Sequence, residues 1–504
     1  MPSTLLPTSM DAHPSATVAR FDPPAVQVEQ RGDGSLLLRS PAALAPHPHS
    51  VLHWLRHWAE RQPDALMLAQ RDGTGAWRRV SWGEALAAVR SLSGVLRRAG
   101  GSQQAPLMIL SENAIEQALI TWAAQYAGIP VAPVSPAYAT ASGELTRLRG
   151  AVRLTRPGLV FAQDGRRFAA ALVEVGLPPS QVITVDHVPA GALAFAEAMA
   201  QPAPADADGL HDALERELPA KYMFTSGSTG VPKAVVVTHG MLAAAQQITS
   251  QVVAQRPARP MVQVDWLPWH HVMGGNVVLG RLLRFGGALY IDEGRPLPGR
   301  FAQTLANLRE VAPTYYFNVP AGYAMLVGQL ERDADFAHHF LSTLAFAYFS
   351  GASLPQELQE RFQQVAQRTV GRRIVIGTAY AATETTAAVM MRTWESQQSA
   401  CVGLPLPGCE LKLMPDAALP GRYELRVRGP NVFRHYLGQE GANPGRDEED
   451  FYRLGDAVRF VAPEDPVQGL LFAGRLSEDF KLANGTWART AALRQRLLDA
   501  CAPL

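Results

Sequence analysis

The chain has 504 residues, which at about 150 residues per domain corresponds to roughly three structural units. Hydrophobic residues make up 47% of the sequence and charged residues 18%, a balance that excludes a wholly disordered chain. The formal net charge of +1 provides no overall attraction to nucleic acid or to an anionic membrane surface.

The number of cysteines and the N-terminal sequence indicate the cellular compartment in which the protein is expected. Three cysteines, Cys401, Cys409 and Cys501, are too few for a disulfide framework, and none lies in a metal-type Cys-x-x-Cys spacing. No basic residue precedes the short apolar stretch near the N-terminus, and no apolar run reaches about 18 residues. We therefore expect a cytoplasmic protein with no secretory signal and no membrane span.

The N-terminal region is expected to be a loosely tied arm followed by helices. Residues 1–48 are rich in Pro, Ala, Ser and His, and the His47-x-His49 pair is interpreted as part of this arm. Helical periodicity then predicts helices over 51–60 and 82–100, the second of which ends on glycine.

Strands and helices alternate through most of the remaining chain. A strand-helix-strand unit over 106–135 is typical of parallel sheets, and its pattern repeats up to residue 200. A low-complexity break at 201–210 precedes a second alternating run, and from residue 391 strands follow one another between Gly and Pro turns. The sequence predicts an α/β fold with two doubly wound α/β lobes, 49–200 and 201–390, and a smaller β subdomain over 391–475.

A run of hydroxyl and glycine residues lies between two predicted strands. Glycines allow close approach of the backbone to an anion, while hydroxyls, backbone N–H groups and a lysine can surround phosphate oxygens. The Walker spacing is absent, and the run leads into a strand instead of a helix. These features favour a phosphate-binding loop over a flexible turn. The predicted loop consists of Thr225, Ser226, Gly227, Ser228, Thr229, Gly230, Val231, Pro232 and Lys233.

This loop resembles the phosphate loop of the adenylate-forming superfamily, which includes acyl- and aryl-CoA ligases, peptide-synthetase adenylation domains and luciferases. Further segments resemble the family's motifs in the same order across residues 222–487. The resemblance implies the large N-terminal domain of such an enzyme. It also implies that the enzyme uses Mg²⁺, ATP and CoA to convert a carboxylic acid through an acyl-adenylate to a thioester, with no nucleic-acid or membrane partner. The oligomeric state stays open, with a homodimer as one option.

Residues 376–384 resemble the family's Tyr-Gly-x-Thr-Glu motif, with Ala381 in place of the usual glycine. The resemblance implies that Tyr380 stacks on adenine, Thr383 contacts the AMP phosphate and Glu384 binds Mg²⁺. A carboxylate oxygen is a ligand that Mg²⁺ prefers, and the metal helps to neutralise the triphosphate. A simple helix cap at this position is the alternative.

Two later positions and one turn resemble the family's nucleotide contacts. Asp456 matches an aspartate that binds the ribose hydroxyls, although Leu454 replaces the customary threonine before it. Arg475 matches an arginine that reaches the ribose or phosphate. The turn at 350–355 resembles one that borders adenine and the acyl pocket, and it includes Ala352.

Residues 265–276 resemble the family's Pro-x-x-His-x-x-Gly motif, which places His271 beside the reacting carboxylate. Amino-acid-specific members often have aspartate there, so His271 argues for an acid that lacks an α-amine. Adjacent histidines can also suggest a metal site, but no third ligand is evident. The resemblance assigns Trp269, Gly351 and Phe349, together with His271, to the acyl pocket.

Residues 474–487 resemble the hinge between the large domain and a mobile lid, with Ser477 or Glu478 as the pivot. The residues of this segment most resemble those of feruloyl-CoA synthetases, and this resemblance implies a hydroxycinnamate substrate. The chain ends 30 residues after Gly474, so residues 476–504 are expected to be the hinge and a stub of the lid. Loss of the lid lysine would then impair activity.

Other functions stay open at this stage. The acid can be another aryl acid, such as a benzoate, or a medium-chain aliphatic acid. A non-catalytic binder of nucleotide or acyl-adenylate is a further alternative, and a peptide-synthetase module is the least favoured.

Overall fold

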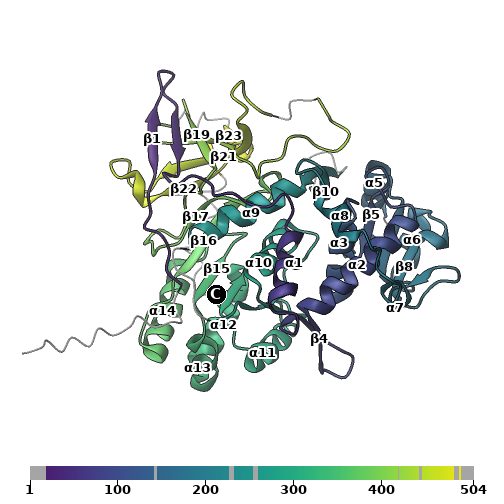
Figure 1. The fold of residues 1–504 in the computed structure, drawn as a ribbon. Helices are drawn as coiled ribbons and strands as arrows, with labels where there is room; N and C mark the ends of the chain where they lie inside the picture. The colour runs from purple at the N-terminus through teal and green to yellow at the C-terminus, as the bar shows by residue number, and fades with distance from the viewer. Residues whose placement is uncertain are drawn as a thin grey trace, which may run out of the picture.

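The fold is described by a computed structural model (Figure 1). The structure describes residues 19–140, 145–225, 232–253, 259–417, 419–441, 445–481 and 487–489. No helix within these ranges is long and apolar enough to cross a membrane.

A seven-stranded sheet organises the first part of the chain in the order β11-β10-β6-β5-β7-β8-β9, parallel except between β10 and β11. Helices cover both faces because neighbouring residues of a strand point to opposite sides. Leu107 and Ile109 of β5 pack with the helices α2 and α3, whereas Met108 and Leu110 pack with α5 and α6. The strands are β5 (Leu107–Leu110), β6 (Val131–Val134), β7 (Leu159–Asp164), β8 (Val182–Asp186), β9 (Leu193–Ala194), β10 (Pro219–Thr225) and β11 (Lys233–Thr238).

An eleven-stranded sheet combines the N-terminal strands β1 and β2 with strands from residues 315–475. The strand order is β1-β2-β19-β20-β21-β22-β18-β17-β16-β15-β14. Its strands β14, β15 and β16 are parallel, and the helices α12, α13 and α14 pack against them (Figure 1). The strands are β1 (Gln27–Gln30), β2 (Leu36–Arg39), β14 (Tyr315–Asn318), β15 (Phe346–Phe349), β16 (Ile376–Ala381), β17 (Ala388–Arg392), β18 (Cys401–Pro405), β19 (Glu410–Pro415), β20 (Tyr423–Arg428), β21 (Tyr452–Phe460) and β22 (Leu470–Arg475).

A third sheet joins β12 (Val262–Asp265), β13 (Ala288–Ile291), β3 (Leu66–Arg71) and β4 (Trp77–Ser81), and β23 (Asp479–Lys481) pairs with β24 (Trp487–Arg489). The helices are α1 (Leu52–Arg61), α2 (Trp82–Arg98), α3 (Ile115–Tyr126), α4 (Pro136–Thr140), α5 (Thr146–Thr155), α6 (Ala169–Val175), α7 (Phe195–Met199), α8 (Ala207–Asp212), α9 (His239–Gln251), α10 (Leu279–Phe285), α11 (Phe301–Glu310), α12 (Pro320–Arg332), α13 (Ala334–Ser342) and α14 (Gln356–Val370). Shorter turns are η1 (Pro179–Gln181), the π-helical η2 (Met273–Val278), η3 (Thr383–Thr385), η4 (Pro466–Gln468) and η5 (Leu476–Glu478).

The predicted α/β fold is confirmed, but the sheets cross the boundaries expected at residues 48, 200 and 390. Strands β1 and β2, which fall in the expected arm, pair with β19 near residue 410 (Figure 1). Strands β10 and β11, expected in the second lobe, extend the sheet of the first. Backbone hydrogen bonds between strands far apart in sequence determine these partners, and composition breaks do not reveal them.

Local sequence signals explain where several helices begin and end. Ser81 accepts a hydrogen bond from the backbone N–H of Glu84 at 3.2 Å, and the Glu84 carboxylate accepts from the N–H of Ser81 at 2.7 Å, which forms a capping box at the start of α2. Thr238 caps α9, the helix that directly follows β11. Gly286 ends α10 with a φ of 70°, a conformation that glycine adopts without strain.

The segment between β20 and β21 pairs with the start of β11. Val235 of β11 forms a bridge with Tyr436, and the backbone N–H of Leu437 donates to the carbonyl of Ala234 at 2.8 Å. The backbone N–H of Phe433 donates to the carbonyl of Glu384, in the turn after β16, at 2.8 Å. Residues 433–437 therefore connect the strand that follows the predicted phosphate loop to the turn that carries Glu384.

Candidate active site

The predicted phosphate loop connects two antiparallel strands. Thr225 at the end of β10 is the register partner of Lys233 at the start of β11. Of the loop itself, Ser226, Gly227, Ser228, Thr229, Gly230 and Val231 lie outside the described residues. Lys233 is exposed, and its Nζ lies 5.2 Å from the centroid of the Tyr436 ring, within cation–π distance.

Glu384 lies in the 3₁₀ turn η3, directly after Thr383, and both residues are half-buried. The Tyr436 hydroxyl donates to Oε1 of Glu384 at 2.9 Å and lies 3.3 Å from the Tyr452 hydroxyl. Burial, then the hydrogen bond with Tyr452 and the charge of Glu384, raise the pKa of Tyr436. Tyr436 therefore stays protonated and can donate to the carboxylate, a contact that the sequence analysis missed.

The backbone beside Glu384 adopts an uncommon conformation. Thr386 is fully buried and has a φ of 62° although it is not glycine. Its carbonyl accepts a hydrogen bond from Nδ2 of Asn276 at 3.0 Å. The side chain of Asn276 thereby connects the Glu384 turn to the π-helix η2. Strained residues held by such contacts are typical of functional sites.

Asp456 and Arg475 are register partners on β21 and β22. Arg475 Nε lies 3.3 Å from Oδ1 of Asp456, and the Tyr380 hydroxyl donates to Oδ2. Asp456 is only 5% exposed, and its pKa is raised because burial outweighs the hydrogen bond from Tyr380 and the charge of Arg475. The structure thus brings together the three side chains that were predicted separately to bind the nucleotide.

Residues 269–271 precede the π-helix and differ strongly in exposure. Trp269 is 3% exposed, whereas His271 is exposed. The rings of His270 and His271 lie 4.4 Å apart between centroids. Desolvation by neighbouring atoms lowers the pKa of His271 although its side chain is exposed, and burial lowers the pKa of His270 to about 3. Both imidazoles are therefore neutral near pH 7.

The remaining predicted positions lie in different environments. Phe349 is 1% exposed and packs in the core formed by β14–β16 and α12–α14, so its ring lies within the core. Gly351 has a φ of 89°, which suits glycine, and Ala352 beside it is exposed. Ser477 and Glu478 are exposed in η5, directly after β22.

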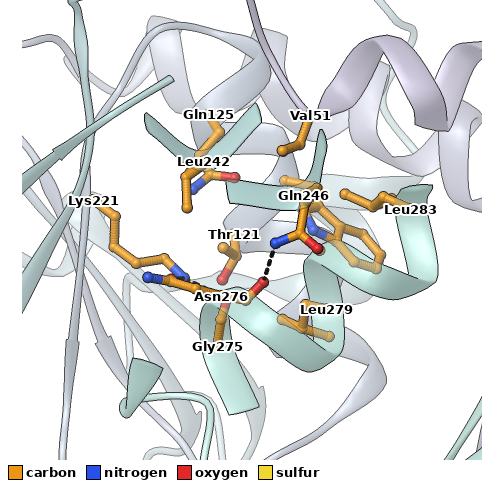
Figure 2. A pocket seen from close by; sticks show the side chains of 12 residues that line it. Val51, Thr121, Gln125, Lys221, Leu242, Gln246, Gly275, Asn276, Leu279 and Leu283 are labelled. Atoms are coloured by element: carbon orange, nitrogen blue, oxygen red, sulfur yellow. Dashed lines mark hydrogen bonds between the residues drawn. The ribbon is translucent and has the colours of Figure 1, made fainter. Parts of the chain in front are cut away.

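A buried lysine, Lys221, donates hydrogen bonds to residues of the π-helix η2. Figure 2 shows Lys221 of β10 beside a cavity of about 20 Å³, the size of one water molecule. Its Nζ donates to the carbonyl of Gly275 at 2.8 Å and to Oδ1 of Asn276 at 3.1 Å, while Nε2 of Gln246 donates to the carbonyl of Asn276 at 3.1 Å (Figure 2). Burial lowers the pKa of Lys221 to about 7.

Comparisons with known proteins define first the fold and then the family. The solved structure of the anthranilate CoA ligase AuaEII with anthranoyl-AMP matches with a TM-score of 0.73 and 16% identity, and the match covers 91% of this chain and 83% of that one. The family model described as "AMP-binding enzyme" matches residues 55–437. The chain therefore belongs to the AMP-binding enzyme family, as the sequence motifs predicted.

Two curated relatives indicate the range of acids within this family. A 3-hydroxybenzoate–CoA ligase of Aromatoleum sp. (strain CIB) is 27% identical over 286 residues, which cover 53% of this chain and 48% of the relative. The 4-coumarate–CoA ligase 2 of Oryza sativa subsp. japonica is 26% identical over 435 residues, which cover 81% of this chain and 72% of the relative. The chain thus spans about half the length of the first relative and nearly three quarters of the second.

Proposed function

We propose that this protein is an AMP-forming acid–CoA ligase that activates an aromatic carboxylic acid of the hydroxycinnamate type. In the first step a carboxylate oxygen forms a bond to the α-phosphorus of ATP, and the bond to pyrophosphate breaks. In the second step the CoA thiol loses its proton, its sulfur bonds to the acyl carbon, and AMP leaves. The observation that carries the proposal has two parts. Tyr436 contacts both Lys233 and Glu384. Asp456 contacts both Tyr380 and Arg475.

Each residue has a role that suits its surroundings. Thr225 and Lys233 suit binding of the triphosphate, with the exposed ammonium of Lys233 as a point charge. Asp456 accepts hydrogen bonds from hydroxyls, as it already does from Tyr380, and in this role it binds the ribose. Neutral His271, exposed at the start of the π-helix, is placed to contact the reacting carboxylate.

The donor atoms at Glu384 fit Mg²⁺. Glu384 offers a carboxylate and Thr383 a hydroxyl, and both are hard oxygen donors. The hydrogen bond from Tyr436 fixes one carboxylate oxygen, which orients the other. Bound there, Mg²⁺ would neutralise charge on the phosphates.

The range of relatives favours a second candidate substrate, a hydroxybenzoate, since a 3-hydroxybenzoate–CoA ligase is among them. A panel of non-hydrolysable acyl-adenylate analogues separates the two candidates: feruloyl, coumaroyl, 3-hydroxybenzoyl, octanoyl and phenylalanyl. A ligand at 100 times its Kd stabilises a protein by about 2.7 kcal/mol, which thermal unfolding detects.

We expect the feruloyl or coumaroyl analogue to raise Tm most, and the phenylalanyl analogue to have no effect. A larger shift with the 3-hydroxybenzoyl analogue would replace the hydroxycinnamate with a benzoate. Absence of any shift, including with AMP alone, would overturn the adenylating function. An Asp456→Ala variant is the control, because specific shifts should disappear in it.

A further inference from the structure

Histidines from two separate segments of the chain gather where α1 and α8 lie close together. His49 precedes α1, His53 lies in its first turn and His211 lies in α8. The ring centroids are 4.6 Å apart for His49 and His53, 5.5 Å for His49 and His211, and 5.2 Å for His53 and His211. One nitrogen of each ring lies within 4.8 Å of one nitrogen of both others. We refer to these three residues as the histidine cluster.

His211 has an unusual environment for an ordinary core residue. Its side chain is 0% exposed, and neither Nδ1 nor Nε2 has a hydrogen-bond partner. Its ring stacks on Tyr126, with centroids 4.3 Å apart and an interplanar angle of 4°, so packing fixes the orientation of the ring. Buried polar groups in native proteins are nearly always bonded, and an unbonded one requires an explanation. A ligand on a ring nitrogen supplies that explanation.

His49 already has the hydrogen bond that is typical of a metal ligand. Its Nε2 lies 3.2 Å from the carbonyl oxygen of His211, and since a carbonyl only accepts, Nε2 carries the proton. With the proton on Nε2, Nδ1 is the nitrogen that can offer a lone pair to a metal ion. Metal-binding histidines usually donate their other ring N–H to a carbonyl or a carboxylate in this way.

The charges around the histidine cluster nearly balance. Arg56 is the nearest cation, and its Nη1 lies 2.5 Å from Oδ1 of Asp212 while its Nε lies 4.0 Å from Oδ2 of Asp208. Oδ1 of Asp212 also lies 3.8 Å from Nε2 of His53 and 3.6 Å from Nδ1 of His211. Asp208 also pairs with Arg90, whose Nη2 lies 2.5 Å from its Oδ2, so two carboxylates face two guanidinium groups.

We propose that His49, His53 and His211 bind one divalent transition-metal ion, with Zn²⁺ as the ion best suited to three imidazoles. Imidazole nitrogen favours Zn²⁺ and its neighbours in the first transition row over Mg²⁺ or Ca²⁺. Ligand nitrogens in an occupied tetrahedral site are about 3.4 Å apart, given metal–nitrogen bonds of about 2.0–2.1 Å. The partly exposed rings of His49 and His53 have room to turn toward the fixed ring of His211. The ion would join the segment before α1 to α8 and hold them together.

The test measures metal content in the full chain after removal of any affinity tag. Protein stripped with EDTA is incubated with Zn²⁺ in millimolar Mg²⁺, so that a magnesium site is saturated, and is then gel-filtered and analysed by mass spectrometry for metals. We expect one Zn²⁺ per chain. Co²⁺ in place of Zn²⁺ should give the visible absorption of a nitrogen-coordinated ion.

Three variants assign the ligands. His53→Ala and His49→Ala each remove a partly exposed side chain, and both should reduce Zn²⁺ retention at least tenfold and abolish the Co²⁺ spectrum. His57→Ala is the matched control, because His57 is exposed on the same helix one turn away from His53, and this variant should keep one Zn²⁺ per chain. The metal should also raise Tm in the wild type and in His57→Ala, but not in the other two variants.

Several outcomes would overturn the proposal. Failure of the wild type to retain Zn²⁺ after gel filtration would exclude the site. Equal retention by the wild type, His49→Ala and His53→Ala would place any bound ion elsewhere. If His53→Ala does not fold, His49→Ala decides, because its residue lies in the loop before α1.

Discussion

Tyr436 illustrates how a single hydroxyl can support the candidate active site. It donates to Glu384 and contacts Tyr452, while the face of its ring lies below Lys233. It was missed because a tyrosine followed by Leu-Gly has no distinctive signal in a single sequence. Its role follows from the pairing of residues 433–437 with β11. Glu384 and Asp456, by contrast, stand in motifs that a single sequence does reveal.

We expect Tyr436→Phe to reduce the rate of acid-dependent ATP–pyrophosphate exchange by about tenfold or more, because a hydrogen bond to a charged group contributes about 1.5–3 kcal/mol. The apparent affinity for Mg²⁺ should fall with it, whereas the ring below Lys233 is kept. Tyr452→Phe is the control, since it preserves the bond between Tyr436 and Glu384. Equal activity in Tyr436→Phe and the wild type would remove this tyrosine from the site.

Lys221 gives stability a defined dependence on pH. Its pKa is about 7 in the folded protein and about 10.5 when unfolded, so between these values the unfolded state binds more protons and stability rises with pH. From pH 7 to pH 8.5 this group alone contributes a gain of about 1.5 kcal/mol in the free energy of unfolding. Urea unfolding at both values should show that gain in the wild type and lose it in Lys221→Met. The same increase in both proteins would assign the effect to other groups.

At the scale of elements, the π-helix η2 depends on two glycines that pack against the preceding loop. A Cβ at Gly275 would lie 2.0 Å from the carbonyl oxygen of Trp269, and one at Gly274 would lie 2.3 Å from that of Leu267. The chain can therefore turn back on itself only with glycine at these positions. This close approach places His271 at the start of the helix and lets Asn276 reach Thr386.

Gly275→Ala should destabilise the protein by about 1–3 kcal/mol, because overpacking forces the backbone to move. Gly328→Ala in α12 is the matched control. Its Cβ would have no neighbour within 4 Å, so it should be neutral or stabilise by up to about 1 kcal/mol. Urea midpoints measure both changes. If Gly275→Ala changes the urea midpoint only slightly, the loop before η2 moves to accommodate the added methyl group at little cost in free energy.

The sequence predicted elements best where apolar residues follow a clear period. The buried strands β5, β7 and β15 are short apolar runs, and α2 carries both a capping box and a regular apolar face. The hairpin β3–β4 was missed because β4 is the half-exposed run Trp-Arg-Arg-Val-Ser, whose pattern does not alternate. The π-helical turn follows from backbone contacts made across the chain, which local periodicity does not report.

At the scale of the whole molecule, the N-terminal hairpin completes the large sheet. Leu37 and Leu38 of β2 are 1% and 0% exposed, and Arg39 forms an ion pair of 2.6 Å with Glu410 of β19. The composition of residues 1–48 suggested an arm because proline and alanine dominate its ends, but the apolar run Leu-Leu-Leu within it is a strand. The sequence analysis therefore predicted no strand here, and a single sequence does not reveal the partner strand β19.

Leu38→Ala should reduce the free energy of unfolding by about 2–5 kcal/mol, as expected for removal of a fully buried leucine side chain. Val28→Ala in the exposed strand β1 is the control and should change stability by less than about 0.5 kcal/mol, since Val28 is 40% exposed. Thermal unfolding compares the two. Similar melting of both variants and the wild type would mean that the hairpin is dispensable, as a loose arm would be.

The position of this hairpin also bears on the time course of folding during synthesis. Residue 39 and its partner Glu410 are separated by 371 positions, so β2 leaves the ribosome long before β19 exists. At about 5–20 residues per second, the wait amounts to roughly 20–75 seconds. During that time the three consecutive leucines of β2 have only β1 as a native strand partner, and they stay accessible to chaperones that bind short apolar segments.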